Sequence, residues 1–346
     1  MNLRGAPFAL ATFLLVICAR GQSQVSFGVL GLFHPHELEL RPADAQVLTV
    51  SSDVQIFALN GEPAHRRLIL RAAGNRILIG GLIAPRITVS ARDGSQGRFQ
   101  LSVPGRMHRI YVGNLTVTAD RGELIAVVAM DRENAVASIV ASEMPRTAPL
   151  EALKAQAVVT RSFLVAGPRH RDFEFCDTTH CQFLRSPDDV DYRIREAVET
   201  TRGLVLTWNQ RPIAAMYSSR CGGQTTTMRE AGMEPGDDYP YYSVDCPWCR
   251  QHPVNWQTRL MPNSQRPQST NESSRIKFAR EWGWKTLPGN HFTITDNAEG
   301  QQVEGQNIGH GLGLCQLGAI GMAAAGGDFR LILAHYYPNS TLRVLP

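Results

Sequence analysis

Two kinds of hydrophobic periodicity divide the chain. Between residue 25 and about residue 105, short runs that are rich in β-branched and apolar residues are separated by Gly, Asp, Asn or Pro, which predicts short β-strands. These runs are 47–50, 54–58, 67–70, 77–79, 87–89 and 99–103. Three further runs, 108–112, 115–118 and 123–130, predict strands that lead directly into a helical region.

The segment 134–167 has helical periodicity, and Pro145 and Pro149 divide it into two helices joined by a short turn. In the first helix, Val136, Ile139 and Val140 form an apolar stripe that ends at Glu143. A carboxyl in such surroundings loses hydration, which raises its pKa and keeps it protonated near neutral pH, as a catalytic acid requires. The alternative is that Glu143 only caps the helix or pairs with an Arg.

The second helix places a charged residue on its buried face. Pro149 suits the first helical position, and Glu151 lies in the first turn, where the helix dipole favours an anion. Arg161 falls on the same face as an apolar stripe of Leu150, Leu153, Ala157 and Leu164. An inward guanidinium needs an acceptor, which Glu143 or an anionic ligand would supply; alternatively, Arg161 extends its head group to water.

The C-terminal half alternates between the two patterns. It predicts helices at 188–200, 271–282, 316–325 and 329–337, a strand at 204–208 and a polar surface loop at 261–272. The predicted fold class is therefore α+β with two lobes, a β-rich lobe at 24–105 and an α+β domain at 106–346. The role of the first lobe is not indicated by its residues.

Composition and net charge limit the classes of partner that the protein can bind. The 346 residues are 43% hydrophobic and 19% charged, as in ordinary globular proteins, and they suffice for one large domain or two smaller ones. A net charge of +4 without any Lys/Arg-rich run excludes a nucleic-acid binder, but it suits an anionic wall polymer.

Residues 1–23 have the pattern of a secretory signal: Arg4, an apolar run at 8–18, and small residues near Ser23. The run is too short to span a bilayer. We therefore expect an exported protein, periplasmic or extracellular, with no membrane span once the signal is removed. Cys18 would leave with the signal.

The helical segment resembles the core of the SpoIID/LytB family. The matching residues are S-E-M-P at 142–145, E-A-L-K-A-Q-A at 151–157 and T-R-S at 160–162. The resemblance implies that Glu143 is the catalytic acid/base of a peptidoglycan lytic transglycosylase. The usual lead-in L-E-x-Y-L-x-G-V is not kept at 132–139, where its Tyr and Gly are missing.

Further blocks extend the resemblance from about Arg106 to the C-terminus. A Y-x-G-x-L pattern occurs at 111–115, and residues 335–342 resemble a closing Y-Y-P-G-T. Residues 216–225 resemble S-x-x-x-G-G-x-T, so Ser218, Gly222 and Gly223 would let the backbone approach a sugar closely; a simple turn between strands is the alternative. Residues 309–319 resemble H-G-x-G-M-S-Q-x-G-A, with Cys315 where Ser is usual, and His310 and Gln316 would bind the glycan.

Four candidate zinc ligands follow the second helix within a dozen residues: His170, Cys176, His180 and Cys181. Two imidazoles and two thiolates suit a closed tetrahedral zinc site, which has no open position and would be structural. A comparable His/Cys zinc site, with an H-C-Q motif, is implied by the family resemblance. The alternative for an exported protein is a Cys176–Cys181 disulfide.

A C-x-x-C motif, Cys246 to Cys249, has a redox, a metal-binding and a structural interpretation. No βαβ pattern surrounds it, which disfavours a redox role. Cys221 would join it, either through a disulfide or as a third metal ligand beside His252. We expect a structural disulfide such as Cys221–Cys246.

Together, the motifs predict an exported lytic transglycosylase that cleaves peptidoglycan glycan strands between MurNAc and GlcNAc and leaves a 1,6-anhydro product. The motif blocks offer no obvious second carboxylate of the kind that other glycosidases use. One alternative is a non-catalytic wall-binding enhancer of a separate cell-wall amidase. A zinc amidase would instead need an open metal site. Neither a need for peptide-free glycan, nor the physiological process, nor the oligomeric state follows from the sequence.

Overall fold

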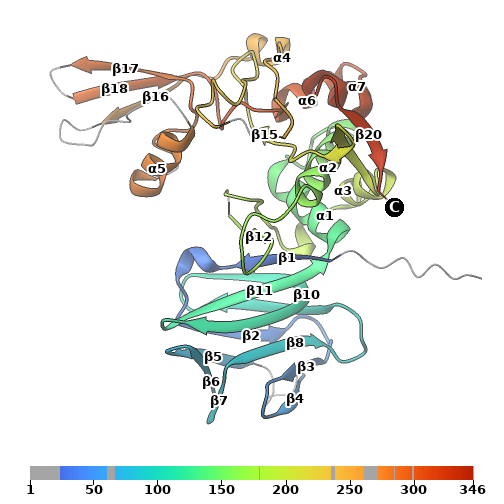
Figure 1. Ribbon diagram of the computed structural model, residues 1–346, viewed down its shortest axis with the longest axis vertical. Coiled ribbons are helices and arrows are strands. Elements are labelled where there is room, and N and C mark those ends of the chain that lie inside the picture. Colours follow the sequence, from blue (N-terminus) through green and yellow to red (C-terminus); the bar gives the residue numbers. More distant parts are fainter. Residues whose placement is uncertain are drawn as a thin grey trace, which may run out of the picture.

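The computed structural model describes residues 24–60, 67–178, 180–234, 238–260, 272–283, 285–297 and 300–345. Within these residues the chain has the predicted α+β fold with a β-rich N-terminal region. One large sheet lies below a layer of helices, and three small sheets accompany the helices (Figure 1). The predicted signal at 1–23 and most of the predicted loop at 261–272 lie outside the described residues, and Glu272 is the first residue of a helix.

The large sheet has 12 strands. Its main path runs β12-β1-β11-β10-β9-β2-β5-β6-β7, with β8, β3 and β4 branching from β10. Only β1 and β12 pair in parallel among these described strands. The strands are β1 (Gln24–Val29), β2 (Glu37–Pro42), β3 (Leu48–Ser51), β4 (Ile56–Leu59), β5 (Leu68–Ala73), β6 (Arg76–Ile79), β7 (Leu82–Ala84), β8 (Arg86–Ala91), β9 (Gly97–Val103), β10 (Met107–Asp120), β11 (Glu123–Asp131) and β12 (Phe175–Cys176).

Alternating side chains explain the sheet's two faces. In β9, Phe99, Leu101 and Val103 are buried while the residues between them are half-buried, as expected for a strand with one face on the core. β11 alternates in the same way. The six predicted strands before residue 105 are confirmed with shifts of up to two residues at most ends, whereas β1, β2 and β7 were not predicted.

The predicted strands 108–112 and 115–118 are one continuous strand, β10. Its first half pairs with β9 and its second half with β8 and β11. Gly113 lies where the partners change, and a Cβ there would come within 2.4 Å of the Ala129 carbonyl oxygen, so only glycine fits. The sequence predicts that the catalytic domain begins near Arg106. In the structure, β9 before this position pairs with β10 after it, so both predicted lobes contribute strands to one sheet. That domain division stays a prediction.

Both predicted core helices are confirmed. Helix α1 (Arg132–Glu143) follows β11 directly, and the side chain of Asp131 caps it by accepting a hydrogen bond from Asn134 N at 3.0 Å. Helix α2 (Leu150–Val165) begins after Pro149. The sequence had suggested Pro149 as the first helical residue, whereas in the structure it is the N-cap residue. Pro145 and the turn after it separate the two helices.

Three of the remaining described helices pack against α2 (Figure 1). The predicted helix 188–200 is a 3-10 turn (Pro187–Asp189) followed by α3 (Tyr192–Thr200), and the other predicted helices are α5 (Glu272–Trp282), α6 (Gln316–Ala324) and α7 (Phe329–Tyr336). Helix α4 (Pro247–Gln251), which contains the C-x-x-C motif, was not predicted. Helix α2 packs against α1, α3, α6 and α7. From Ala152 to Leu164, all its residues except Lys154 are buried.

Three small sheets complete the fold. The predicted strand 204–208 is β13 (Leu204–Trp208), which pairs with β14 (Arg211–Pro212) and β20 (Thr341–Val344). The pair β15 (Tyr217–Ser218) and β19 (Leu314–Cys315) is parallel. Strands β16 (Trp256–Leu260), β17 (Phe292–Asn297) and β18 (Gly300–Gly305) form the third sheet, which extends away from α2 and has α5 beside it (Figure 1). No helix among the described residues combines the length and apolar character needed to cross a membrane.

Candidate functional site

Glu143 ends α1 and remains half-buried beside the fully covered Ile139 and Val140. Burial raises the pKa of its carboxyl from 4.5 to about 7, although a hydrogen bond from Gln316 and the charge of Arg185 both act to lower it. A carboxyl in this state is protonated for much of the time at neutral pH and still reaches solvent. The expected stripe and its effect on Glu143 are therefore present in the structure.

Arg185 reaches Glu143 because the loop after the His/Cys segment is fixed to α1. Ser138 Oγ donates to Arg185 O at 2.7 Å and accepts from Arg185 N at 2.9 Å, while Ser142 Oγ donates to Phe183 O at 2.6 Å. Two serines on one face of the helix thus hold residues 183–185 against the turn that precedes Glu143. Arg185 was not singled out by the sequence.

Gln316 is the first residue of α6 and lies beside Glu143. Its side chain is 7% exposed, and its Nε2 lies 3.4 Å from Gln156 Oε1 on α2. The predicted site residue Gln316 and the E-A-L-K-A-Q-A block therefore meet at the acid. The Gln316 side-chain amide donates a hydrogen bond that favours the ionised form of Glu143, so it limits how far burial raises the pKa of the carboxyl.

Tyr217 brings β15 to the same place. Burial raises the pKa of the Tyr217 phenol well above its usual value, and the charge of the nearby Glu143 raises it further. The Tyr217 hydroxyl donates to Gln182 Oε1 at 2.7 Å, so the residue after Cys181 is linked to the neighbourhood of the acid. Tyr217 lay inside a matched block but carried no separate prediction.

Ser218 follows Tyr217 and pairs with Cys315 in the parallel β15–β19 ladder. Its side chain is 4% exposed, and its Oγ has no hydrogen-bond partner among the described residues. A buried hydroxyl without a partner costs free energy, which makes it a candidate for contact with a ligand. The structure thus places this predicted residue between Tyr217 and the H-G-L-G-L-C-Q segment.

His310 is half-buried, and burial lowers the pKa of its imidazole to about 4, so the ring is neutral at pH 7. Its Nδ1 accepts from Leu312 N at 3.0 Å. The proton of the neutral ring is therefore on Nε2, which is a hydrogen-bond donor. A hydrogen bond from the His310 ring to the Tyr217 backbone acts in the opposite direction on this pKa and ties His310 to β15.

Gly222 and Gly223 form a turn with positive φ angles of +80° and +112°. A Cβ on Gly222 would lie 2.9 Å from the Gln306 carbonyl oxygen, so the close approach is to the chain itself. The simpler interpretation of this pair as a turn therefore accounts for both glycines. Gly222 also lines a cavity described below.

Arg161 is enclosed by the protein, and its acceptor is Glu133 in place of the Glu143 or anionic ligand that the sequence suggested for substrate binding. Its side chain is fully buried and binds Glu133 through Nε at 2.8 Å and Nη2 at 2.7 Å. Leu204 O and Val198 O accept its remaining hydrogen bonds, at 3.0 and 3.3 Å. Arg161 instead joins α2 to the start of α1, to α3 and to the start of β13, and the suggested pairing with Glu143 is absent.

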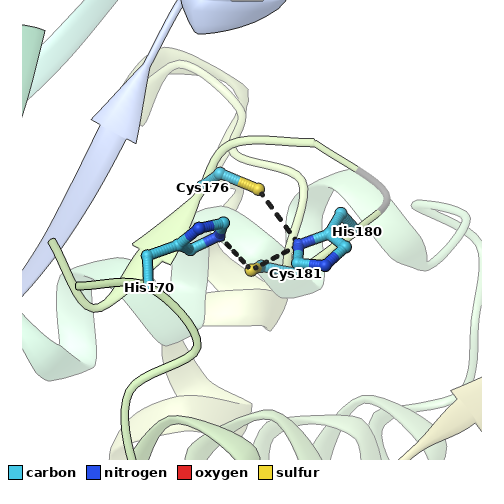
Figure 2. Close-up of side chains that lie close together, drawn as sticks. All are labelled: His170, Cys176, His180 and Cys181. Carbon is cyan, nitrogen blue, oxygen red and sulfur yellow. Dashed lines mark hydrogen bonds between the residues drawn. The ribbon is translucent and has the colours of Figure 1, made fainter. Parts of the chain in front are cut away.

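His170, Cys176, His180 and Cys181 converge as the spacing predicted (Figure 2). Their candidate ligand atoms all lie within 4.8 Å of one another, and both cysteines are free, so the alternative disulfide is absent. His170 Nε2 is 3.2 Å from Cys181 Sγ, and His180 Nδ1 is 3.4 Å from the same sulfur. Hydrogen bonds from Cys181 and Thr178 lower the pKa of the Cys176 thiol, which favours the thiolate that binds metals.

The loop carrying these ligands is anchored to the large sheet. Strand β12 pairs with β1, and the 6% exposed Asp177 accepts hydrogen bonds from Leu30 N and Arg109 at 3.2 Å. The four-residue cluster therefore lies between the sheet and the helices, on the side from which Gln182 reaches Tyr217.

The other four described cysteines form a second cluster, of which the sequence had grouped Cys221, Cys246 and Cys249 but not Cys315. Cys221, Cys246, Cys249 and Cys315 are all free, so the expected Cys221–Cys246 disulfide is absent. His252 is not part of the cluster: its Nδ1 lies 3.0 Å from Trp248 O, and its ring stacks on Trp248. Cys315 is the fourth member of the cluster instead of His252. It lies 66 residues after Cys249 in the chain, so no local spacing indicated that the two would meet.

Two cavities lie near these elements. The larger, of about 720 Å³, is lined by Gly222, Trp256, Asn290 and His291, among other polar and aromatic residues. The second, of about 420 Å³, lies against α1 and includes Ser138 and Arg185. Glu143 lines neither cavity; it lies one helical turn beyond Ser138 and Ile139.

Comparison with known proteins gives a consistent set of relatives. Residues 120–208 match the family model for SpoIID, stage II sporulation protein. The chain is 27% identical over 262 residues to an uncharacterized protein of Brachyspira hyodysenteriae, covering 66% of this chain and 70% of the relative. It is 28% identical to stage II sporulation protein D of Bacillus subtilis, covering 61% and 74%. It is 22% identical to the amidase enhancer of Bacillus subtilis, covering 59% of this chain and 39% of that protein.

Proposed function

We propose that this chain, which belongs to the SpoIID/LytB family, is an exported peptidoglycan lytic transglycosylase in which Glu143 is both catalytic acid and base. The family indicates a function related to the cell wall. The half-buried carboxyl of Glu143, with a pKa of about 7, is the observation that supports this more specific activity.

Glu143 has the protonation behaviour that both steps of such a reaction need. In the first step, the protonated carboxyl donates its proton to the oxygen that bridges MurNAc and GlcNAc, and the bond from C1 of MurNAc to that oxygen breaks. In the second step, the resulting carboxylate accepts the proton of the C6 hydroxyl of the same MurNAc. The C6 oxygen bonds to C1, which gives the 1,6-anhydro sugar and returns the proton to Glu143.

The surroundings of Glu143 fit a mechanism with one carboxyl. Two-carboxylate glycosidases place their acids about 5 to 9.5 Å apart, and a second carboxylate so near would raise the pKa of the first. Among the described residues, the charged group that shifts the pKa of Glu143 is Arg185, which is a cation. Arg185 and Gln316 would both stabilise the carboxylate formed after the first proton transfer.

Residues of the matched motif blocks and of the larger cavity offer contacts to a glycan. His310 is held beside Ser218's strand by a hydrogen bond to the Tyr217 backbone, and Ser218 has a buried hydroxyl without a partner among the described residues. The larger cavity combines Trp256 with the polar side chains of Asn290 and His291, a combination suited to sugar rings and hydroxyls. We propose that glycan strands bind along these residues.

We further propose that His170, Cys176, His180 and Cys181 hold a structural zinc ion. Two imidazole and two thiolate donors that already converge match a closed tetrahedral site. When bound, zinc would crosslink this loop, and Gln182, the next residue, would then hold the Tyr217 hydroxyl at 2.7 Å. The ion would thereby position Tyr217 beside Glu143 without touching the substrate.

The decisive experiment compares the products from purified glycan strands by mass spectrometry. The wild type should release fragments with 1,6-anhydro ends, and Glu143→Gln should reduce their rate by about 100-fold or more, since acid–base catalysis contributes about 10²–10⁴-fold. Glu199→Gln is the matched control, because Glu199 lies on the exposed side of α3 and should not affect the rate. Strands with and without stem peptides test whether peptides must be removed first.

The amidase enhancer of Bacillus subtilis makes a wall-binding enhancer the rival function. Such a protein would accelerate a separate cell-wall amidase and would release no anhydro ends, and Glu143→Gln would leave that acceleration intact. Wild-type protein that binds glycan strands but yields no anhydro product would refute the proposed transglycosylase.

A further inference from the structure

Four cysteines from three separate segments meet in the interior. Cys221 precedes the Gly222–Gly223 turn, Cys246 and Cys249 begin α4, and Cys315 precedes α6. Their sulfur atoms all lie within 4.8 Å of one another, and each residue is at most 2% exposed. Each thiol therefore has the other three as neighbours, although the chain brings them together across almost 100 residues.

We propose that Cys221, Cys246, Cys249 and Cys315 form a second, structural zinc site. Zinc–sulfur bonds of about 2.3 Å in a tetrahedron separate the sulfurs by about 3.8 Å. The observed separations fit this arrangement, with 3.4 Å between Cys249 and Cys315 and none above 4.8 Å. Four sulfur ligands in a tetrahedron are typical of zinc.

The alternatives fit the geometry less well. A disulfide joins sulfurs at about 2.05 Å in isolated pairs, whereas these four converge on one point. An iron–sulfur cluster distributes its four cysteines over two or four iron atoms, which requires wider separation of the sulfurs than one shared ion does. Four unrelated buried thiols would pack as small apolar groups, with no reason for their sulfurs to converge.

The shell around the sulfurs supports a metal centre. Gly318 N lies 3.4 Å from Cys315 Sγ and donates to it, and the Tyr336 hydroxyl lies 3.3 Å from Cys246 Sγ. Such donors stabilise metal-bound thiolates. A Cβ on Gly318 would lie 2.6 Å from Cys246 Sγ and 1.9 Å from the Tyr336 hydroxyl. Only a glycine at this position therefore allows α6 to pack so closely against the sulfurs.

The proposed ion would connect the C-terminal motif to the rest of the site. Cys315 immediately precedes Gln316, which binds Glu143, and it pairs with Ser218 in the β15–β19 ladder. Helix α4 and the Gly222 turn would be fixed to α6 through the same ion. The site thus supplies a crosslink between three segments that hold the candidate glycan-binding residues.

Measuring the zinc content of the protein tests this proposal independently of any glycan-cleaving activity. Full-length protein purified without chelators should contain one more zinc ion per chain than Cys249→Ser, by native mass spectrometry and elemental analysis. The matched control Cys181→Ser removes a ligand from the His/Cys cluster only, so it should keep the zinc of the four-cysteine site. Equal zinc content in the wild type and Cys249→Ser, or iron in place of zinc, would overturn the assignment.

Alkylation of the wild type gives a second measurement if Cys249→Ser does not fold. Denaturation with a chelator and without reductant should release the zinc and make all four cysteines reactive toward iodoacetamide. Peptide mapping that finds a disulfide among the four, or release of no zinc from a protein whose four thiols are free, would contradict the proposal. In the cobalt-substituted protein, Cys249→Ser should weaken the sulfur-to-cobalt charge-transfer band.

Discussion

The raised pKa of Glu143 makes a prediction about stability that is independent of any substrate. In Glu143→Gln, a neutral side chain of nearly the same shape replaces the carboxyl, and Gln does not titrate. The difference in unfolding free energy between the wild type and this variant should therefore change with pH because of Glu143 alone.

The sign follows from the direction of the shift. The folded protein holds the proton more tightly than the unfolded chain, so the stability that Glu143 contributes is fully present below pH 4.5 and is lost as the pH rises through about 7. The rise from 4.5 to about 7, at about 1.4 kcal/mol for each pH unit, sets an upper limit of about 3.5 kcal/mol. Residual contact with water reduces the expected change to about 2 kcal/mol.

Urea unfolding at a series of pH values between 4 and 8.5 measures this change. Relative to Glu143→Gln, the wild type should lose about 2 kcal/mol of stability over this range, mainly between pH 4.5 and 7. The control Glu199→Gln should show a small effect of the opposite sign, because a hydrogen bond from Arg202 lowers the pKa of Glu199. Parallel curves for the wild type and Glu143→Gln would refute the claim that burial governs this carboxyl.

Three further predictions test other parts of the structure. Glu133→Gln leaves the buried Arg161 without its anionic partner and should cost about 3–5 kcal/mol in urea unfolding, whereas Glu199→Gln, at an exposed pair, should cost about 1 kcal/mol or less. Gly313→Ala should lower the melting temperature more than Gly94→Ala, since both have positive φ but only the former places a Cβ 2.1 Å from the Met216 carbonyl oxygen. The kcat/KM of glycan cleavage should fall about tenfold per pH unit above about pH 7, as Glu143 in the free enzyme loses its proton; a rate that is constant from pH 6 to 9 would contradict this.

Local patterns in the sequence determined the elements and the principal residues of the candidate site. The 3.6-residue period placed Glu143 at the end of an apolar stripe, and the surrounding structure shows the burial that follows from it. The close spacing of His170, Cys176, His180 and Cys181 predicted a cluster because a short loop can bring such neighbours together. The same local reasoning located α1, α2 and β13 within a few residues.

Only the tertiary structure decided which distant residues meet. Arg161 had an inward direction in the sequence, but its partner Glu133 became evident only when α1 and α2 packed together. Cys315 joins three cysteines that precede it by 66 residues or more, and Gln316 reaches Glu143 from α6. Periodicity reports which face of an element is buried, because that depends on nearby residues. It does not report what covers that face, because chain topology and packing choose the partner.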